Sequence, residues 1–128
     1  MRIADVCEFY SEGGGGIRTY VNSKLRAAAR LGHDVTVIAP RPEPGVDEVE
    51  GGRIVWIKSP PAPGDPRYAI LLNRSAVHRA LDAWDPQLVE GSSFWQGGVF
   101  AAQWPRPVPK VMVFHQDLVA VIPHTYLD

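Results

Sequence analysis

The stretch Arg30-Leu31-Gly32-His33-Asp34-Val35-Thr36-Val37-Ile38-Ala39-Pro40 decides the fold, because it joins the end of a predicted helix to a buried strand. Apolar residues occupy nearly every position of Asp34–Ala39, as in strands that are covered on both faces. Gly32 follows the last periodic residue of the helix, where a left-handed cap is favoured. The stretch therefore predicts a helix that packs on a parallel sheet.

Outward from this stretch, apolar runs and helical repeats alternate along the chain. Strands are predicted at Arg2–Glu8, Asp34–Ala39, Gln87–Gly91 and Lys110–His115, with a hairpin at residues 46–58 around Gly51-Gly52. Helices are predicted at Ile17–Leu31, from Asp65-Pro66 to about Trp84, and at Phe94–Gln103. This order is typical of the α/β class, with a Rossmann-like, doubly wound, mostly parallel sheet.

The composition excludes several classes of protein. Thirteen basic and 14 acidic residues leave a net charge of −1, so no nucleic acid partner is expected. The single cysteine, Cys7, excludes an internal disulfide and fits a reducing compartment. No run approaches the roughly 18 apolar residues of a membrane span, and Met1–Val6 shows no signal-peptide core. The expected location is cytoplasmic, with peripheral attachment to the inner face of the membrane as an alternative.

The first candidate site is the loop Phe9–Gly16, which follows the first predicted strand and contains four consecutive glycines. Glycine amides and the start of the following helix favour a phosphate at the carboxyl end of a strand. The loop is not a Walker motif, since no Lys-Ser/Thr follows it, and no acid ends the second strand as a dinucleotide site requires. We therefore expect contact with a phosphate or diphosphate, and the alternative is a plain connector.

Two further loops leave predicted strands at the same end of the sheet. The second loop carries Ser92 and Ser93, either of which can cap the short helix, and Ser93 is also a candidate substrate-binding residue. The third loop places His115 directly after the last strand, with Asp117 beside it. A lone histidine there is either a satisfied hydrogen-bonding residue or a functional one. No Cys/His spacing indicates a metal site.

Three segments, in order, resemble the N-terminal domain of family 4 GT-B glycosyltransferases. They are Phe9–Val21, Arg30–Pro40, and the pair formed by Glu90–Phe94 and Val113–Asp117. The resemblance covers nearly all 128 residues. It implies the N-terminal half of a GT-B fold, in which a nucleotide-diphosphate sugar lies mainly on a C-terminal domain. The sugar, lipid or small-molecule acceptor lies mainly on the domain seen here. Transfer is then retaining and uses no metal ion or other cofactor.

The resemblance also implies roles for individual residues. His115 matches the active-site histidine near the transferred sugar, and it is the predicted catalytic residue. Gly15 and Gly16 match the loop that approaches the donor diphosphate or the acceptor, and Asp117 matches a less constant position. Ser93 completes the predicted substrate-binding set. The family's Glu-x₇-Glu pattern belongs to the C-terminal domain, so residues 1–128 are expected to be a truncated acceptor-side domain that is inactive alone.

Two alternatives compete with the glycosyltransferase interpretation. A stand-alone flavodoxin-like module would bind a phosphorylated small molecule without catalysis. A receiver-type domain would need acidic residues at strand ends, whereas Asp5 lies inside the first strand and no matching acid pair is visible. Because the same fold hosts many functions, the fold class does not choose between these possibilities.

Overall fold

The computed structural model describes residues 1–10, 16–92 and 96–113 of the 128-residue chain. The elements in chain order are β1 (Arg2–Val6), α1 (Gly16–Arg30), β2 (Asp34–Arg41), β3 (Gly45–Val49), β4 (Gly52–Lys58), β5 (Pro61–Ala62), β6 (Asp65–Ala69), α2 (Arg74–Trp84), β7 (Leu88–Gly91), α3 (Gln96–Gln103) and β8 (Lys110–Met112). Strands and helices alternate along most of the chain, so the predicted α/β class with a Rossmann-like sheet is confirmed.

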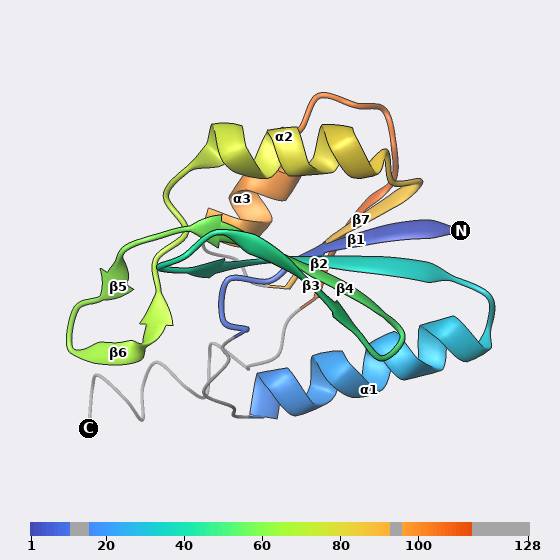
Figure 1. Ribbon diagram of the computed structural model, residues 1–128. Helices are drawn as coiled ribbons and strands as arrows, with labels where there is room; N and C mark the ends of the chain where they lie inside the picture. The colour runs from blue at the N-terminus through green and yellow to red at the C-terminus, as the bar shows by residue number, and fades with distance from the viewer. Residues whose placement is uncertain (11–15, 93–95, 114–128) are drawn as a thin grey trace, which may run out of the picture.

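The main sheet contains six strands in the order β3-β4-β2-β1-β7-β8. Every neighbouring pair is parallel except β3 and β4, which are antiparallel. From β1 the chain first builds outward through β2 to β4, and it then crosses to the other side of β1 to form β7 and β8 (Figure 1). The strand order therefore reverses between β1 and β7, and open α/β sheets bind ligands at the carboxyl ends of the strands at such a point.

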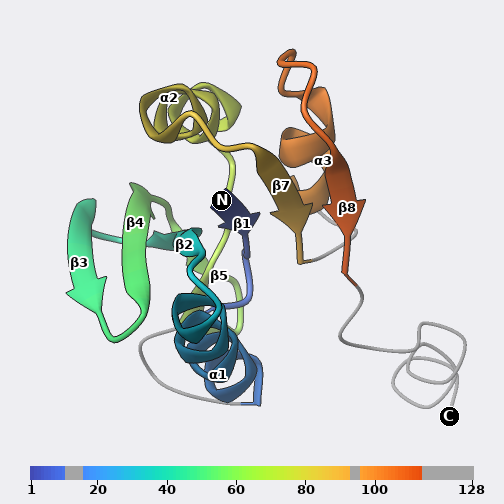
Figure 2. The same ribbon diagram turned by 90° about the vertical axis from the view of Figure 1, so that its right-hand side faces the viewer.

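Helix α1 covers one face of the sheet, and helices α2 and α3 cover the other (Figure 2). Successive side chains of a strand point to opposite faces of the sheet, so each strand contributes to the core on both faces. In β1, Ile3 belongs to the same buried cluster as Val21 and Leu25 of α1. The adjacent residue, Ala4, belongs to the cluster that contains Leu81 of α2. Strands that are apolar at nearly every position are thus explained by burial on both faces.

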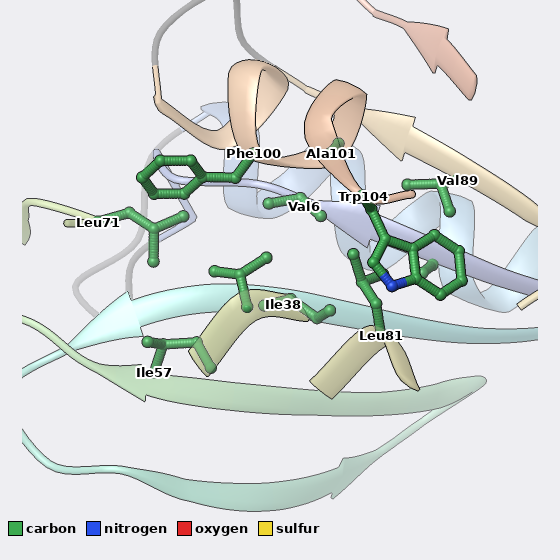
Figure 3. Close-up of a cluster of buried hydrophobic side chains, with 11 residues drawn as sticks. Val6, Ile38, Ile57, Leu71, Leu81, Val89, Phe100, Ala101 and Trp104 are labelled. Atoms are coloured by element: carbon green, nitrogen blue, oxygen red, sulfur yellow. The ribbon is translucent and has the colours of Figure 1, made fainter. Parts of the chain in front are cut away.

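The cluster beneath α2 and α3 includes two large aromatic side chains, Phe100 and Trp104 (Figure 3). Trp104, with 1% of its surface exposed, lies beside Leu81, and Phe100 points toward Leu71. The indole nitrogen of Trp104 donates a hydrogen bond to Asp82 at 3.0 Å. Apolar burial of this kind stabilises by roughly 25 cal/mol per Å². It packs α3 against the sheet independently of any polar contact.

The predicted hairpin at residues 46–58 is confirmed as β3 and β4, with Gly51 in the left-handed region at φ +90°. Gly52 is required by close approach, because a Cβ there would lie 2.4 Å from the carbonyl oxygen of Val35. The predicted alternation also holds: Trp56 packs in the cluster next to α1, and Ile57 packs in the cluster next to α2.

The predicted second helix starts eight residues too early, since its cap was placed at Asp65 and the observed cap is Asn73, so that prediction is wrong. Residues 65–69 instead form β6, which pairs with β5, and Gly64 turns the chain between them at φ +79°. The amide of Ile70 closes this small hairpin on the carbonyl of Pro60 at 2.8 Å. The helix begins only at Arg74, where the side chain of Asn73 accepts from the amide of Ala76.

The first helix ends as predicted, since Gly32 has φ +83° and its amide donates to the carbonyl of Ala29 at 3.0 Å. Two side chains that the helical pattern assigns to its buried side, Tyr20 and Ala29, are exposed instead. A short stripe around Val21 is enough to cover the sheet on this face. None of the described helices is long and apolar enough to cross a membrane.

Candidate functional site

The first two candidate loops begin side by side at the point where the strand order reverses. Val6 and Gly91 are register partners at the carboxyl ends of β1 and β7. One residue further, the amide of Ser92 donates to the carbonyl of Val6 at 3.0 Å, and the amide of Cys7 donates to the carbonyl of Ile38 at 2.9 Å. The parallel register thus brings together loops that lie more than 80 residues apart in the sequence.

The start of α1 is suited to an anion. Gly16 is its first residue, and its first turn contains no acidic side chain. A helix start presents backbone N–H groups and the positive end of the helix dipole. Arg18 adds a cation to that first turn. The phosphate contact expected for the glycine loop stays a prediction, because residues 11–15 lie outside the described residues.

Tyr10 joins the beginning of this loop to α1. Its hydroxyl donates to the side chain of Asn22 at 2.9 Å, and the ring is 4% exposed. Burial raises the pKa of the Tyr10 phenol, while the nearby Arg18 and Asn22 act in the opposite direction. The sequence analysis assigned no role to Tyr10 or Arg18. Their positions on either side of the glycine run were the available signal.

A buried acid pair lies between β1 and β7. Asp5 and Glu90 are register partners, and Asp5 is completely buried. The ammonium of Lys24, from α1, lies 3.1 Å from Asp5 and also contacts the carboxylate of Glu90. The hydroxyl of Ser92, a predicted helix cap, donates instead to Asp5 at 2.5 Å. Asp5 and Glu90 therefore form an acid pair that the sequence alone did not reveal. Lys24 contacts both carboxylates, and Ser92 bonds to Asp5.

Cys7 adjoins this cluster and is 1% exposed. Burial raises the pKa of its thiol to about 12, and the charge of Asp5 acts in the same direction. The nucleophilic form of cysteine is the thiolate. Cys7 is consequently a protonated packing residue at neutral pH.

The carboxylate of Glu8, two residues after β1, caps the start of helix α3. The backbone amide of Gly97 donates to the carboxylate of Glu8 at 3.2 Å, and Glu8 is 7% exposed. A carboxylate at a helix start satisfies a free amide and complements the dipole. Gly98 packs closely against β7, because a Cβ on Gly91 would lie 2.9 Å from the Cα of Gly98.

A groove of about 680 Å³ lies between the beginnings of α2 and α3. Its lining combines amide, hydroxyl and guanidinium groups with apolar side chains: Leu72, Asn73, Arg74, Ser75, Gln96, Val99, Phe100 and Gln103. Both helices begin at the end of the sheet toward which the parallel strands point (Figure 1). Leu72 and Ser75, which line it, are exposed. No motif in the sequence indicated this groove.

The structure describes only one of the predicted site residues, Gly16. Gly16 is the first residue of α1, the helix that follows β1 along the chain. Gly15, Ser93, His115 and Asp117 lie outside the described residues, so their roles stay predictions. In the described parts of the chain, His, Cys, Asp and Glu side chains form no group of three or more that could hold a metal ion.

Comparison with known proteins bears on this geometry. Residues 15–126 match the family model described as the glycosyl transferase 4-like domain. The fold is similar to that of sucrose-phosphate synthase from Thermosynechococcus elongatus, with a TM-score of 0.70 and 16% sequence identity. The match covers 98% of this chain but only 35% of that one, and at this identity it shows the fold alone. No curated protein matches the sequence.

Proposed function

Because this chain belongs to the glycosyl transferase 4-like domain family, we propose that it is the acceptor-side domain of a retaining glycosyltransferase. The reaction moves a sugar from a nucleotide-diphosphate sugar to an acceptor hydroxyl. A C-terminal domain supplies most of the donor contacts. This chain spans 35% of the length of the structural relative.

The observation that carries the proposal is the start of α1, the helix that follows β1 and the glycine run and has no acidic side chain in its first turn. Cleavage of the sugar–phosphate bond develops negative charge on the leaving diphosphate. Groups that are already oriented toward that charge lower the barrier more than they stabilise the bound substrate. The backbone amides of the helix start at Gly16 would be such groups, and Arg18 adds a positive charge to the same turn. We expect them to act without a metal ion, and this expectation is part of the proposal.

His115 is the residue that we propose for catalysis, next to the transferred sugar. In the complete enzyme, His115→Ala should lower kcat at least about 100-fold. The urea midpoint of the variant should stay within error of the wild type. Wild-type kinetics would remove His115 from the active site. Asp117→Asn and Ser93→Ala should raise a substrate KM, as expected of binding residues.

The function itself is tested with the complete enzyme and a panel of nucleotide-diphosphate sugars. Transfer should give a product whose anomeric configuration matches the donor, as measured by proton NMR coupling. An inverted product would contradict the retaining mechanism. Gly16→Val should raise the donor KM, because a side chain would block approach to the helix start. Binding of phosphorylated ligands without any transfer would favour the flavodoxin-like alternative.

We further propose that the groove between α2 and α3 holds the acceptor. Its amide and hydroxyl groups can bond sugar hydroxyls, and Leu72 and Val99, which are 58% and 41% exposed, offer apolar contact. The guanidinium of Arg74 lies 3.4 Å from the side-chain oxygen of Gln103 across the groove. A polar acceptor with an apolar portion would match both parts of this lining.

The groove is tested by charge removal on one helix. Arg74→Ala should raise the acceptor KM by about tenfold or more, as expected for loss of a charged hydrogen bond. Arg79→Ala makes the same change on the same helix outside the groove lining, and it should leave that KM unchanged. Equal values for the two variants would place the acceptor elsewhere.

The single cysteine supports a cytoplasmic location for this reaction, with peripheral attachment at the inner membrane face as the alternative.

A further inference from the structure

Two buried carboxylates hold the chain on either side of residues 93–95. On the β7 side, the hydroxyl of Ser92 donates to Asp5 at 2.5 Å. On the α3 side, the backbone amide of Gly97 donates to Glu8 at 3.2 Å. Both acceptors come from β1 or the residues directly after it. The end of β7 and the start of α3 are thereby tied to the same strand.

Buried carboxylates are costly, so their presence requires a reason. Removing an ionised group from water costs several kcal/mol unless its oxygens are paired. Asp5 is fully buried and Glu8 is 7% exposed. Apolar packing through Phe100 and Trp104 already binds α3 to the sheet. Apolar contacts have no direction, whereas a hydrogen bond to one amide fixes where the helix starts.

We propose that Glu8 is a positioning residue that fixes the α3 wall of the acceptor groove, and that Asp5 is a positioning residue that fixes the end of β7, from which the chain leads to α3. The first turn of α3 carries Gln96 and Val99 into that wall. Glu8 holds the amide of Gly97, directly beside Gln96. Asp5 holds Ser92 and is itself held by Lys24 at 3.1 Å. We call these two contacts, Asp5 with Ser92 and Glu8 with Gly97, the carboxylate clamp. The inference rests on the proposed function, which places the acceptor in the groove.

The kinetic test uses Glu8→Ala in the complete enzyme. Acceptor KM should rise about tenfold, because a small displacement of binding groups is costly, while donor KM should change less than about twofold. Glu8→Gln keeps an oxygen acceptor and should restore most of the acceptor affinity. The contact between Asp5 and Ser92 is tested with Ser92→Ala, which leaves the contact between Asp5 and Lys24 in place. Ser92→Ala should raise the acceptor KM in the same direction.

A matched control separates positioning from stability. Asp82→Ala removes the hydrogen bond to the Trp104 indole, just beyond the other end of α3. It should lower the unfolding midpoint without changing the acceptor KM. If Glu8→Ala lowers the midpoint similarly and also leaves the acceptor KM unchanged, the clamp is purely structural and the proposal is overturned.

Amide hydrogen exchange supplies a readout that needs no substrate. On the full chain, Glu8→Ala should speed exchange at Gly97 and Gly98 about tenfold or more, while Asp82→Ala should leave those rates unchanged. Unchanged exchange in Glu8→Ala overturns the clamp. Faster exchange in an enzyme that transfers no sugar from any donor supports the clamp and contradicts the proposed function, so the two failures are distinguishable.

Discussion

Replacement of Lys24 with methionine removes the cation that lies between the buried carboxylate of Asp5 and the partly buried carboxylate of Glu90. The Lys24 ammonium is 3.1 Å from Asp5 and contacts Glu90, whose side chain is 15% exposed. Asp5 is fully buried, so water cannot replace the lost partner. Methionine preserves the apolar stem of lysine, and the loss is therefore mainly electrostatic. Breaking a buried ion pair from one side costs about 3–5 kcal/mol, a large part of the roughly 5–15 kcal/mol that stabilises a typical domain.

Urea denaturation followed by tryptophan fluorescence at neutral pH measures this loss. Arg30→Met makes the same kind of change at an exposed position of the same helix, and it should cost less than about 0.5 kcal/mol. Adding Asp5→Asn to Lys24→Met should recover part of the stability, because it removes one of the orphaned charges. A loss below about 1 kcal/mol for Lys24→Met would refute the reasoning, since it would mean that these carboxylates do not need the lysine.

Three further predictions concern stability. Burial raises the pKa of the Cys7 thiol from 9.0 to about 12, so its contribution is present below pH 9 and is lost as pH rises toward 12. Wild-type stability should therefore fall above pH 9 by about 1.4 kcal/mol per pH unit more than that of Cys7→Ala, and parallel urea curves would contradict this. Gly52→Ala forces a Cβ to 2.4 Å from a backbone oxygen of β2 and should cost about 1–3 kcal/mol. Gly32→Ala meets open space and should cost only about 1 kcal/mol of backbone strain, so a larger loss at Gly32 would be a contrary result. Leu81→Ala should cost about 2–5 kcal/mol in thermal or urea unfolding, and a value equal to that of the exposed Leu72→Ala would be inconsistent with the core described.

Local patterns predicted the fold class and several of its details correctly. The all-apolar run Asp34–Ala39 predicted a strand buried on both faces, and β2 is buried through its middle. Gly32 and Gly51 were also located correctly, because a left-handed backbone position favours glycine whatever surrounds it. Such features depend on neighbours within a few residues, so they are available from the sequence.

The start of α2 shows where local patterns are insufficient. Asp65-Pro66 and Asn73 both satisfy the rules for a helix start. The choice between them depends on the pairing of β5 with β6 and on the hydrogen bond from Ile70 to Pro60. Two signals of equal local quality cannot be ranked without those contacts.

In the candidate site, too, some features follow from the sequence and others follow only from tertiary contacts. The sequence by itself determined that a glycine-rich loop lies between a strand and a helix, which is enough to predict an anion-binding helix start at Gly16. Only the tertiary structure decided that Asp5 lies beside Glu90 with Lys24 between them, and that Glu8 caps α3. Their separation along the chain reaches 89 residues. The register of parallel strands and the packing of helices on either face brought them together, and no pattern of neighbouring residues specifies contacts at that range.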